Sequence, residues 1–347
     1  RVIPPERGSI WDANGYLLAT NLHYWEIAAS PPLVTEPEEL ADQLAQILGI
    51  DRAELYSELT SNTQWVRLAN YVPQQAGEVV DGLNANGLIC TPHTLRTYPM
   101  DDLVAHLIGI VNSTGNGFYG VEGAHNKPLR GITGTMEIEI GPDGRTLPIP
   151  PRILRSPQRG QDLVLTLDLN IQHIVLQELA RAVDLYEAQK GSAIVMDPRT
   201  GDLLAIASLP GYNPNQYATT EPALLADPVV SRMWEPGSIL KIITWAAGLD
   251  AGVITPDMTV HDKGEIEVGG RVIENADRKA HGEVTITQAL VESLNTVAAH
   301  ISTTLGKERF HNYLRRFGFG DLTGVDLASE GPGMMKYPGV SNWFPSE

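Results

Sequence analysis

The segment Glu235-Pro236-Gly237-Ser238-Ile239-Leu240-Lys241 is followed by an apolar run over residues 242–249. Pro236-Gly237 predicts a sharp turn, and the apolar run predicts a buried helix that begins at Ser238. Residues three apart share one face of a helix, so Ser238 and Lys241 are expected to point the same way. A helix N-terminus stabilises an oxyanion, and a lysine removed from water can accept a proton from serine. The segment therefore predicts an activated serine nucleophile.

A second short motif, Ser293-Leu294-Asn295, follows about 55 residues later. Thr285 is expected to cap one short helix and residues 296–305 to form another, so Ser293 and Asn295 lie where two helices join. Both side chains can then face a cleft. Each motif alone also has a purely structural explanation, because Ser238 can serve as an N-cap and Ser293 and Asn295 as local backbone caps.

Size and composition limit the possible functions. The 347 residues favour two domains, and 42% hydrophobic and 19% charged residues are typical of a soluble globular protein. The net charge of −17 without a basic stripe argues against a nucleic-acid partner. Cys90 is the only cysteine, which excludes an internal disulfide, and no His-x-x-x-His pair supports a metal site. We expect no metal and no cofactor.

The first part of the chain alternates turn signals with short periodic segments. Asn14-Gly15 between two apolar stretches predicts a hairpin, and Asp143-Gly144 predicts another. Residues 148–157 contain four prolines and are expected to form an extended linker. This places the domain boundary at residues 157/158. Three helices are predicted at 37–48, 51–59 and 73–84, and extended structure at 106–111.

The second part reads as an α+β layered domain, in which antiparallel hairpins are backed by long helices. We predict a strand at 162–168, a long helix at 169–188, a strand hairpin at 192–197 and 203–208, and a loop-rich stretch from 255 to 282.

Taken together, these motifs resemble the class B penicillin-binding proteins, which are serine D,D-transpeptidases of peptidoglycan. The joint pattern of Ser-x-x-Lys and Ser-x-Asn is more specific than either half. The resemblance extends over nearly the whole chain, through the segments Arg7-Gly8-Ser9-Ile10-Trp11-Asp12, Arg96-Thr97-Tyr98-Pro99, Gly120 to Gly131, Leu165-Thr166-Leu167-Asp168, Met196 to Ala205, and Gly318 to Leu327.

The resemblance implies a role for each site residue. Ser238 would be acylated by a peptidoglycan stem peptide, and Lys241 would accept its proton. Ser293 would relay a proton to the leaving or entering amine, and Asn295 would bind the substrate amide and hold Lys241. The backbone N–H of Ser238 would donate to the oxyanion. A β-lactam antibiotic would acylate the same serine.

The resemblance also implies an architecture and a location. Residues 1–157 would form a non-catalytic pedestal domain of the dimerisation type, which docks cell-wall synthesis proteins. Residues 158–347 would form the transpeptidase domain. We expect the protein at the extracytoplasmic face of the bacterial membrane, with a membrane anchor N-terminal to this chain.

One departure concerns the family's third motif, Lys-Thr-Gly, which the sequence lacks. We expect the chain to be truncated before this motif, and the fragment to be impaired, because the motif supplies a substrate-carboxylate site and a second oxyanion donor.

Two other functions stay open at this point. The protein could be a non-enzymatic cell-wall scaffold that docks partners through its pedestal domain. It could also be a β-lactamase or β-lactam sensor, which shares Ser238, Lys241 and Asn295 but does not need the N-terminal domain.

Overall fold

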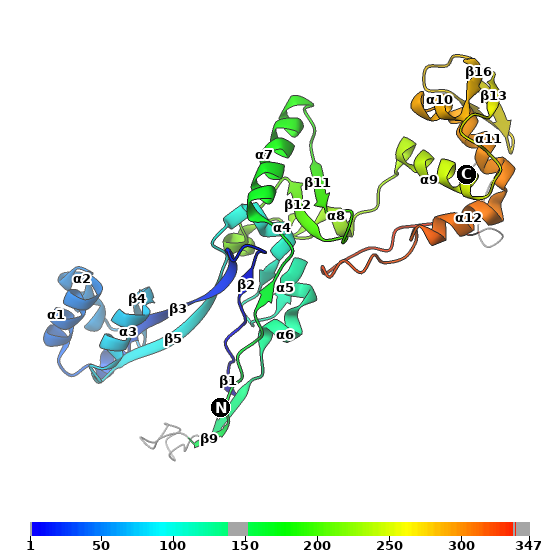
Figure 1. Cartoon of the computed structure of the whole chain (residues 1–347). Coiled ribbons are helices and arrows are strands. Elements are labelled where there is room, and N and C mark those ends of the chain that lie inside the picture. Colours follow the sequence, from blue (N-terminus) through cyan, green and yellow to red (C-terminus); the bar gives the residue numbers. More distant parts are fainter. Residues whose placement is uncertain (1, 138–151, 336, 338–347) are drawn as a thin grey trace. The chain divides into compact units, whose positions relative to one another are not determined.

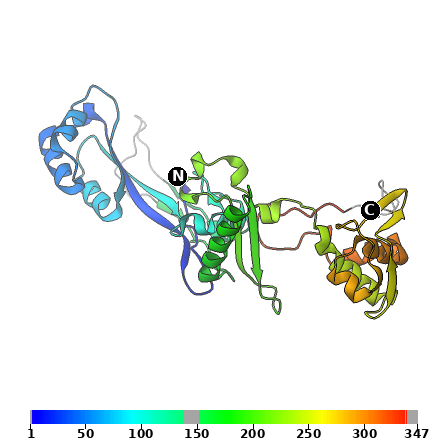
Figure 2. The same cartoon turned by 90° about the horizontal axis from the view of Figure 1, so that it is seen from above.

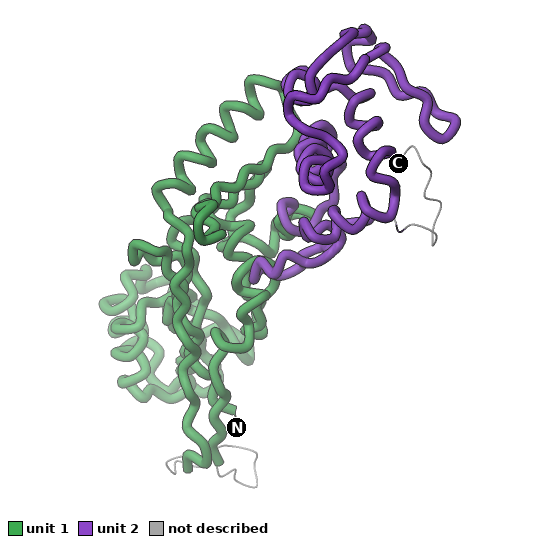
Figure 3. The backbone as a smooth tube through the Cα atoms, turned by 45° about the vertical axis from the view of Figure 1, so that its right-hand side comes forward, with its two compact units in different colours: residues 1–227 green, residues 228–347 purple. Residues whose placement is uncertain are grey.

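The structure is a computed structural model that describes residues 2–137, 152–335 and 337. The chain divides into two compact units, residues 1–227 and 228–347 (Figure 3). Both units combine helices and strands, which confirms the predicted α+β class. Within the described ranges, no helix is both long and apolar enough to cross a membrane. The hairpin predicted at Asp143-Gly144 lies outside the described residues.

The predicted N-terminal hairpin is present. Strand β2 (Ile10–Trp11) pairs antiparallel with the long strand β3 (Leu17–Ala29). At the turn, Gly15 adopts φ +86°, a conformation that glycine reaches without a steric penalty. The Asp12 carboxylate accepts hydrogen bonds from the backbone N–H groups of Asn14 (2.9 Å) and Tyr16 (2.7 Å) and so fixes the turn.

Strand β3 is the centre of a sheet that three helices cover on one face. It pairs antiparallel with β4 (Val66–Pro73) and β5 (Leu88–Thr97) (Figure 1). Helix α3 approaches β3 closely because Gly77 has no side chain; a Cβ there would lie 2.1 Å from the Trp25 ring. All three helices were predicted, the third four residues too long, and their bounds are α1 (Pro37–Leu48), α2 (Arg52–Leu59) and α3 (Gln74–Asp81).

The predicted proline-rich linker is partly a strand. Strand β8 (Gly134–Glu137) lies between β1 (Val2–Ile3) and β9 (Arg152–Arg155), and residues 148–151 lie outside the described residues. Strand β10 (Leu163–Val164), shorter than predicted, pairs parallel with β2. These pairings join β9 and β10 to the first compact unit, which extends to residue 227. The compact units are defined by packing alone and do not test where one functional domain ends and the next begins. The domain boundary at 157/158 therefore stays a prediction.

Extended structure at residues 106–111 was predicted wrongly. Residues 105–108 form a helical turn, α4 (Ala105–Ile108), and only β6 (Ile110–Val111) is extended. All four residues of α4 are buried, and a short, fully buried segment carries no periodicity that separates helix from strand. The neighbouring elements are β7 (Gly117–Phe118), α5 (Gly120–Ala124) and α6 (Asn126–Arg130).

The predicted long helix and the strand hairpin after it are present, although the helix was predicted three residues too long. Helix α7 (Leu169–Leu185) lies against the antiparallel pair β11 (Gly191–Met196) and β12 (Leu203–Leu209) in both views (Figures 1 and 2). Buried Gln172 on α7 binds β12 as another strand would. Its Oε1 accepts from Ile206 N (2.9 Å), and its Nε2 donates to Ile206 O (2.7 Å). These bonds satisfy backbone groups of a buried strand.

The second unit is built on a helical core beside two small antiparallel strand pairs, in a region where a loop-rich stretch had been predicted. That prediction was wrong because each strand has only four residues. The strands are β13 (Thr259–Asp262), which pairs with β16 (Gly282–Thr285), and β14 (Glu265–Val268), which pairs with β15 (Arg271–Glu274). The helices are α8 (Pro228–Ser231), α9 (Leu240–Asp250), α10 (Ile286–Val291), α11 (Asn295–Leu305) and α12 (Lys307–Arg316).

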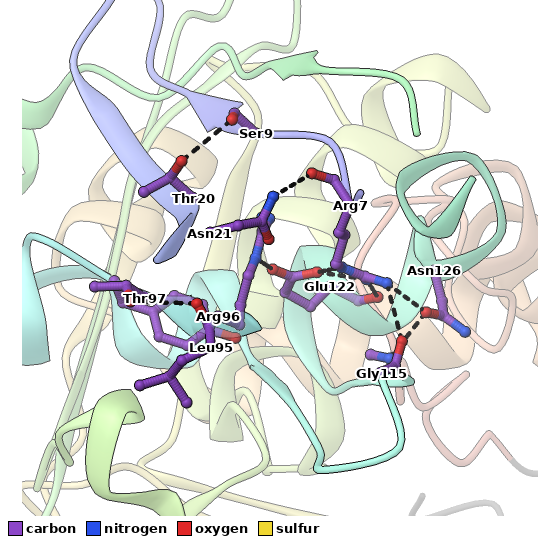
Figure 4. A network of polar contacts seen from close by, with 12 residues as sticks. Arg7, Ser9, Thr20, Asn21, Leu95, Arg96, Thr97, Gly115, Glu122 and Asn126 are labelled. Carbon is purple, nitrogen blue, oxygen red and sulfur yellow. Dashed lines mark hydrogen bonds and ion pairs between the residues drawn. The ribbon is translucent and has the colours of Figure 1, made fainter. Parts of the chain in front are cut away.

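A buried ion cluster joins the N-terminal segment to α5 in the first unit (Figure 4). Glu122 is fully buried and accepts hydrogen bonds from Arg7 Nε and Arg96 Nε, each at 2.7 Å. Asn21 donates to Arg7 O (2.6 Å) and accepts from Arg96 Nη1 (3.2 Å), while Asn126 accepts from Arg7 Nη1 (2.9 Å). The cluster therefore holds together segments more than 100 residues apart in sequence.

We predict that Glu122→Gln lowers the free energy of unfolding by about 3–5 kcal/mol, because it leaves two buried guanidinium groups without a carboxylate. Urea unfolding measures the change. The control is Glu178→Gln, which breaks the exposed pair with Arg181 and should change stability by less than about 1 kcal/mol. Equal effects of the two substitutions would contradict the assigned importance of the buried cluster.

Candidate active site

Lys241 is the centre of the site. It lies in the first turn of α9, is only 9% exposed, and directs its amine at the junction between α10 and α11. Its Nζ donates to three acceptors there: Ser293 O (2.5 Å), Ser293 Oγ (3.0 Å) and Asn295 Oδ1 (2.6 Å). The amine and both members of the Ser-x-Asn motif are therefore in direct contact.

Burial lowers the pKa of Lys241 below its ordinary value of 10.5. Removal from water disfavours the charged ammonium, whereas the three acceptors favour it, and the burial effect is the larger. An amine in this state gives up and takes back a proton more readily near neutral pH than a solvated lysine does.

Ser293 adopts an uncommon backbone conformation, with φ at +53°. For a residue with a side chain this region costs about 1–2 kcal/mol, and strain of this kind is concentrated at functional sites. The conformation allows both the carbonyl and the hydroxyl of Ser293 to reach the same ammonium group. A regular helix through this residue would place its carbonyl along the helix axis instead.

Asn295 is held in one orientation. It is the first residue of α11, and its Nδ2 donates to Glu274 O at 2.8 Å. With the amide nitrogen directed at a carbonyl, the amide oxygen must face Lys241, where it accepts at 2.6 Å.

Ser238 is placed differently from its prediction. It lies in a short 3-10 turn (Gly237–Ile239), and the α-helix begins only at Leu240. Its side chain is exposed rather than buried, and its hydroxyl makes no hydrogen bond with any residue that the structure describes. Gly237 has φ +56°, as the predicted turn at Pro236-Gly237 requires. The described contacts therefore join Lys241, Ser293 and Asn295 but do not include Ser238, which is exposed three residues before Lys241.

The sequence did not predict the buried polar cluster that begins at Thr296, the residue after Asn295. Asp262, Asn275 and Thr296 are all at least 95% buried and hydrogen-bonded to one another. One signal was available, since Thr296 follows Asn295 directly. The other two residues lie in the stretch taken for a loop. Across the described part of the chain, no group of three or more His, Cys, Asp or Glu residues could hold a metal ion.

Two family models together cover most of the sequence. The penicillin-binding protein dimerisation domain matches residues 2–165, and the penicillin-binding protein transpeptidase domain matches residues 191–344. This chain belongs to the class B penicillin-binding proteins.

Relatives of this class B penicillin-binding protein share about a third of its residues. The probable peptidoglycan D,D-transpeptidase PbpC of Pseudomonas aeruginosa is 31% identical over 339 residues, 96% of this chain and 59% of the relative. The stage V sporulation protein D of Bacillus subtilis is 30% identical over 337 residues, 95% of this chain and 52% of the relative. The chain thus spans only a little over half the length of these curated relatives.

The fold of this penicillin-binding protein is also found among solved structures. The crystal structure of penicillin-binding protein 2X from Streptococcus thermophilus matches with a TM-score of 0.83 at 22% identity, covering 97% of this chain and 54% of that one. At this identity the match supports the fold alone.

We predict opposite effects of glycine at two serines near the site. At Ser293, glycine relieves the left-handed strain, so Ser293→Gly should be more stable than Ser293→Ala by about 0.5–1 kcal/mol. At Ser302, inside α11, the order should reverse by about 1 kcal/mol, because glycine weakens a regular helix. Urea unfolding of the four variants tests both comparisons. A Ser293→Ala protein as stable as Ser293→Gly would show that the backbone is unstrained.

Proposed function

We propose that the protein is a peptidoglycan D,D-transpeptidase that works through a serine acyl-enzyme at Ser238. The observation that carries this proposal is the buried Lys241 amine, bonded to Ser293 and Asn295 and one turn after Ser238. An enzyme of this kind needs a nucleophile, a nearby base of lowered pKa and a group that orients the base. Its family membership and its relatives' names support the substrate class.

In this mechanism, Ser238 Oγ attacks the carbonyl carbon of the penultimate D-alanine of a stem peptide. Lys241 in its neutral form takes the hydroxyl proton. The peptide C–N bond then breaks, and the terminal D-alanine leaves as a free amine after receiving a proton. The amino group of a neighbouring stem peptide attacks the resulting ester and forms the cross-link, which returns the proton to Ser238.

Ser293 and Asn295 have supporting roles in this proposal. The Ser293 hydroxyl, 3.0 Å from Lys241 Nζ, can pass a proton between the lysine and the leaving or entering amine. Asn295 holds the lysine with its amide oxygen and would bind the substrate amide. The N–H of Ser238, in the first turn of its helical segment, would donate to the oxyanion.

The proposal extends to partners and location. Residues 1–157 are proposed as a non-catalytic domain that docks cell-wall synthesis proteins, and residues 158–347 as the transpeptidase domain. A structure of similar fold is the complex between Penicillin-Binding Protein (PBP2) and MreC from Helicobacter pylori, with a TM-score of 0.68 at 23% identity, covering 96% of this chain and 68% of that one. Stem peptides and β-lactam antibiotics are the proposed ligands, met at the extracytoplasmic face of the membrane.

We predict that a labelled penicillin forms a covalent ester with Ser238 of the full-length protein. Intact-mass spectrometry and peptide mapping should locate the adduct on the peptide that contains Ser238. Ser238→Ala should form none, whereas Ser192→Ala, a change in β11 of the other compact unit, should form the adduct normally. A wild-type protein without an adduct would overturn the proposed chemistry. Rapid loss of the label would instead indicate a β-lactamase.

We also predict that acylation slows as the pH falls, because the ammonium form of Lys241 cannot accept a proton. Burial lowers the pKa of Lys241, so the midpoint of this decline should lie below 10.5. Lys241→Arg keeps the charge but cannot release a proton at these pH values, so it should acylate about 10²–10⁴-fold more slowly at every pH. Penicillin acylation rates measured across pH test this. A midpoint at or above 10.5, or an active Lys241→Arg variant, would exclude Lys241 as the base.

A further inference from the structure

Asp262 is a buried carboxylate that four neutral groups satisfy. It is 3% exposed, and no cation pairs with it among the described residues. Its Oδ1 accepts from Thr296 Oγ1 (2.7 Å) and Gly264 N (3.0 Å), and its Oδ2 accepts from Asn275 Nδ2 (2.8 Å) and His281 N (3.0 Å). Burial raises the pKa of Asp262, but these hydrogen bonds outweigh it and hold the pKa below its ordinary value. The group is therefore a charged anchor.

The four donors come from different segments of the second unit. Gly264 lies before β14, Asn275 directly after β15, His281 before β16, and Thr296 in the first turn of α11. One carboxylate at the end of β13 thus fixes both antiparallel strand pairs, β13–β16 and β14–β15, against the start of α11. Removing such an acceptor would leave several buried donors unsatisfied.

This anchor is directly connected to the candidate active site. Two consecutive residues of α11, Asn295 and Thr296, contact the last residue of β15 and the residue that follows it. Asn295 Nδ2 donates to Glu274 O (2.8 Å), and Thr296 lies beside Asn275, with Oγ1–Oδ1 at 3.1 Å and N–Oδ1 at 3.3 Å. The Asn295 oxygen that these contacts orient is the one that accepts from Lys241 Nζ. The position of Asn295 therefore depends on Thr296 being held.

We propose that Thr296, anchored by Asp262, is a positioning residue that keeps the Asn295 carboxamide against the Lys241 amine. This inference rests on the proposed acyl-transfer function. Thr296 touches neither Ser238 nor Lys241 in the described contacts, so it acts through Asn295 and not on the reacting atoms. Without the hydroxyl, the start of α11 loses its bond to Asp262, and the contact between Asn295 and Lys241 loosens.

Loosening that contact has an effect that a loss of stability alone does not produce. Asn295 Oδ1 favours the ammonium form of Lys241, so withdrawing it lowers the pKa of Lys241 further. The decline of acylation at low pH must then move to lower pH. The acylation rate at high pH, where Lys241 is neutral, must also fall. The reason is that Asn295 no longer holds the Lys241 amine in one position.

The test compares Thr296→Val with Thr296→Ser in the full-length protein. Valine keeps the shape and removes the hydroxyl, whereas serine keeps the hydroxyl. The matched control is Thr303→Val on the same helix, where the hydroxyl bonds only to its own helix backbone and is exposed. The probe is a fluorescent penicillin, with the acylation rate measured against pH and divided by the folded fraction from circular dichroism.

We expect Thr296→Val to acylate about 10–100-fold more slowly, with the low-pH decline shifted to lower pH, and Thr296→Ser and Thr303→Val to follow the wild type. Wild-type rate and pH profile in Thr296→Val would overturn the proposal, as would a slow Thr296→Ser. If the valine variant does not fold, Thr296→Ala removes the same hydroxyl without added bulk and is judged by the same criteria. A wild-type protein that forms no adduct would overturn the acyl-transfer function instead.

Discussion

The site depends on one buried amine that is held by oxygen atoms and has no carboxylate partner among the described residues. A buried lysine would usually be paired with an acid, which would raise its pKa and make it useless as a base at neutral pH. Here three neutral acceptors, two on Ser293 and one on Asn295, satisfy the hydrogens of Lys241. They fix the position of the amine, while burial lowers its pKa below the ordinary value. The acceptors thus set the position of the amine and favour its ammonium form, and burial outweighs them in its effect on the pKa.

The backbone and the hydrogen bonds around Lys241 fix the positions of those acceptors. Ser293 turns its carbonyl and hydroxyl to one point only by adopting a left-handed backbone, and the helices on either side hold it there. Asn295 is oriented by a backbone carbonyl of β15, which is itself fixed by the Asp262 anchor. Strain at one residue is therefore tolerated because a network of satisfied hydrogen bonds surrounds it.

Both compact units use a buried carboxylate to join distant segments, but with different partners. Glu122 is bound by two arginines, which ties the N-terminal segment and β5 to α5. Asp262 is bound by neutral donors. The two arginines compensate the negative charge of Glu122, whereas the amide, hydroxyl and backbone donors of Asp262 leave its charge uncompensated.

Local signals in the sequence determined much of the fold and the residue types of the two site motifs. The turn at Asn14-Gly15, the C-cap Gly49 that follows α1 and the N-cap Thr285 of α10 all depend on signals that act over a few residues. The spacings of the two motifs likewise identified four candidate residues, of which three are in contact. Tertiary structure alone decided the buried turn α4, the four-residue strands β13 to β15 and the role of Asp262. A short buried segment has no periodicity, and a hydrogen bond between residues 34 apart leaves no trace in the spacing of either motif.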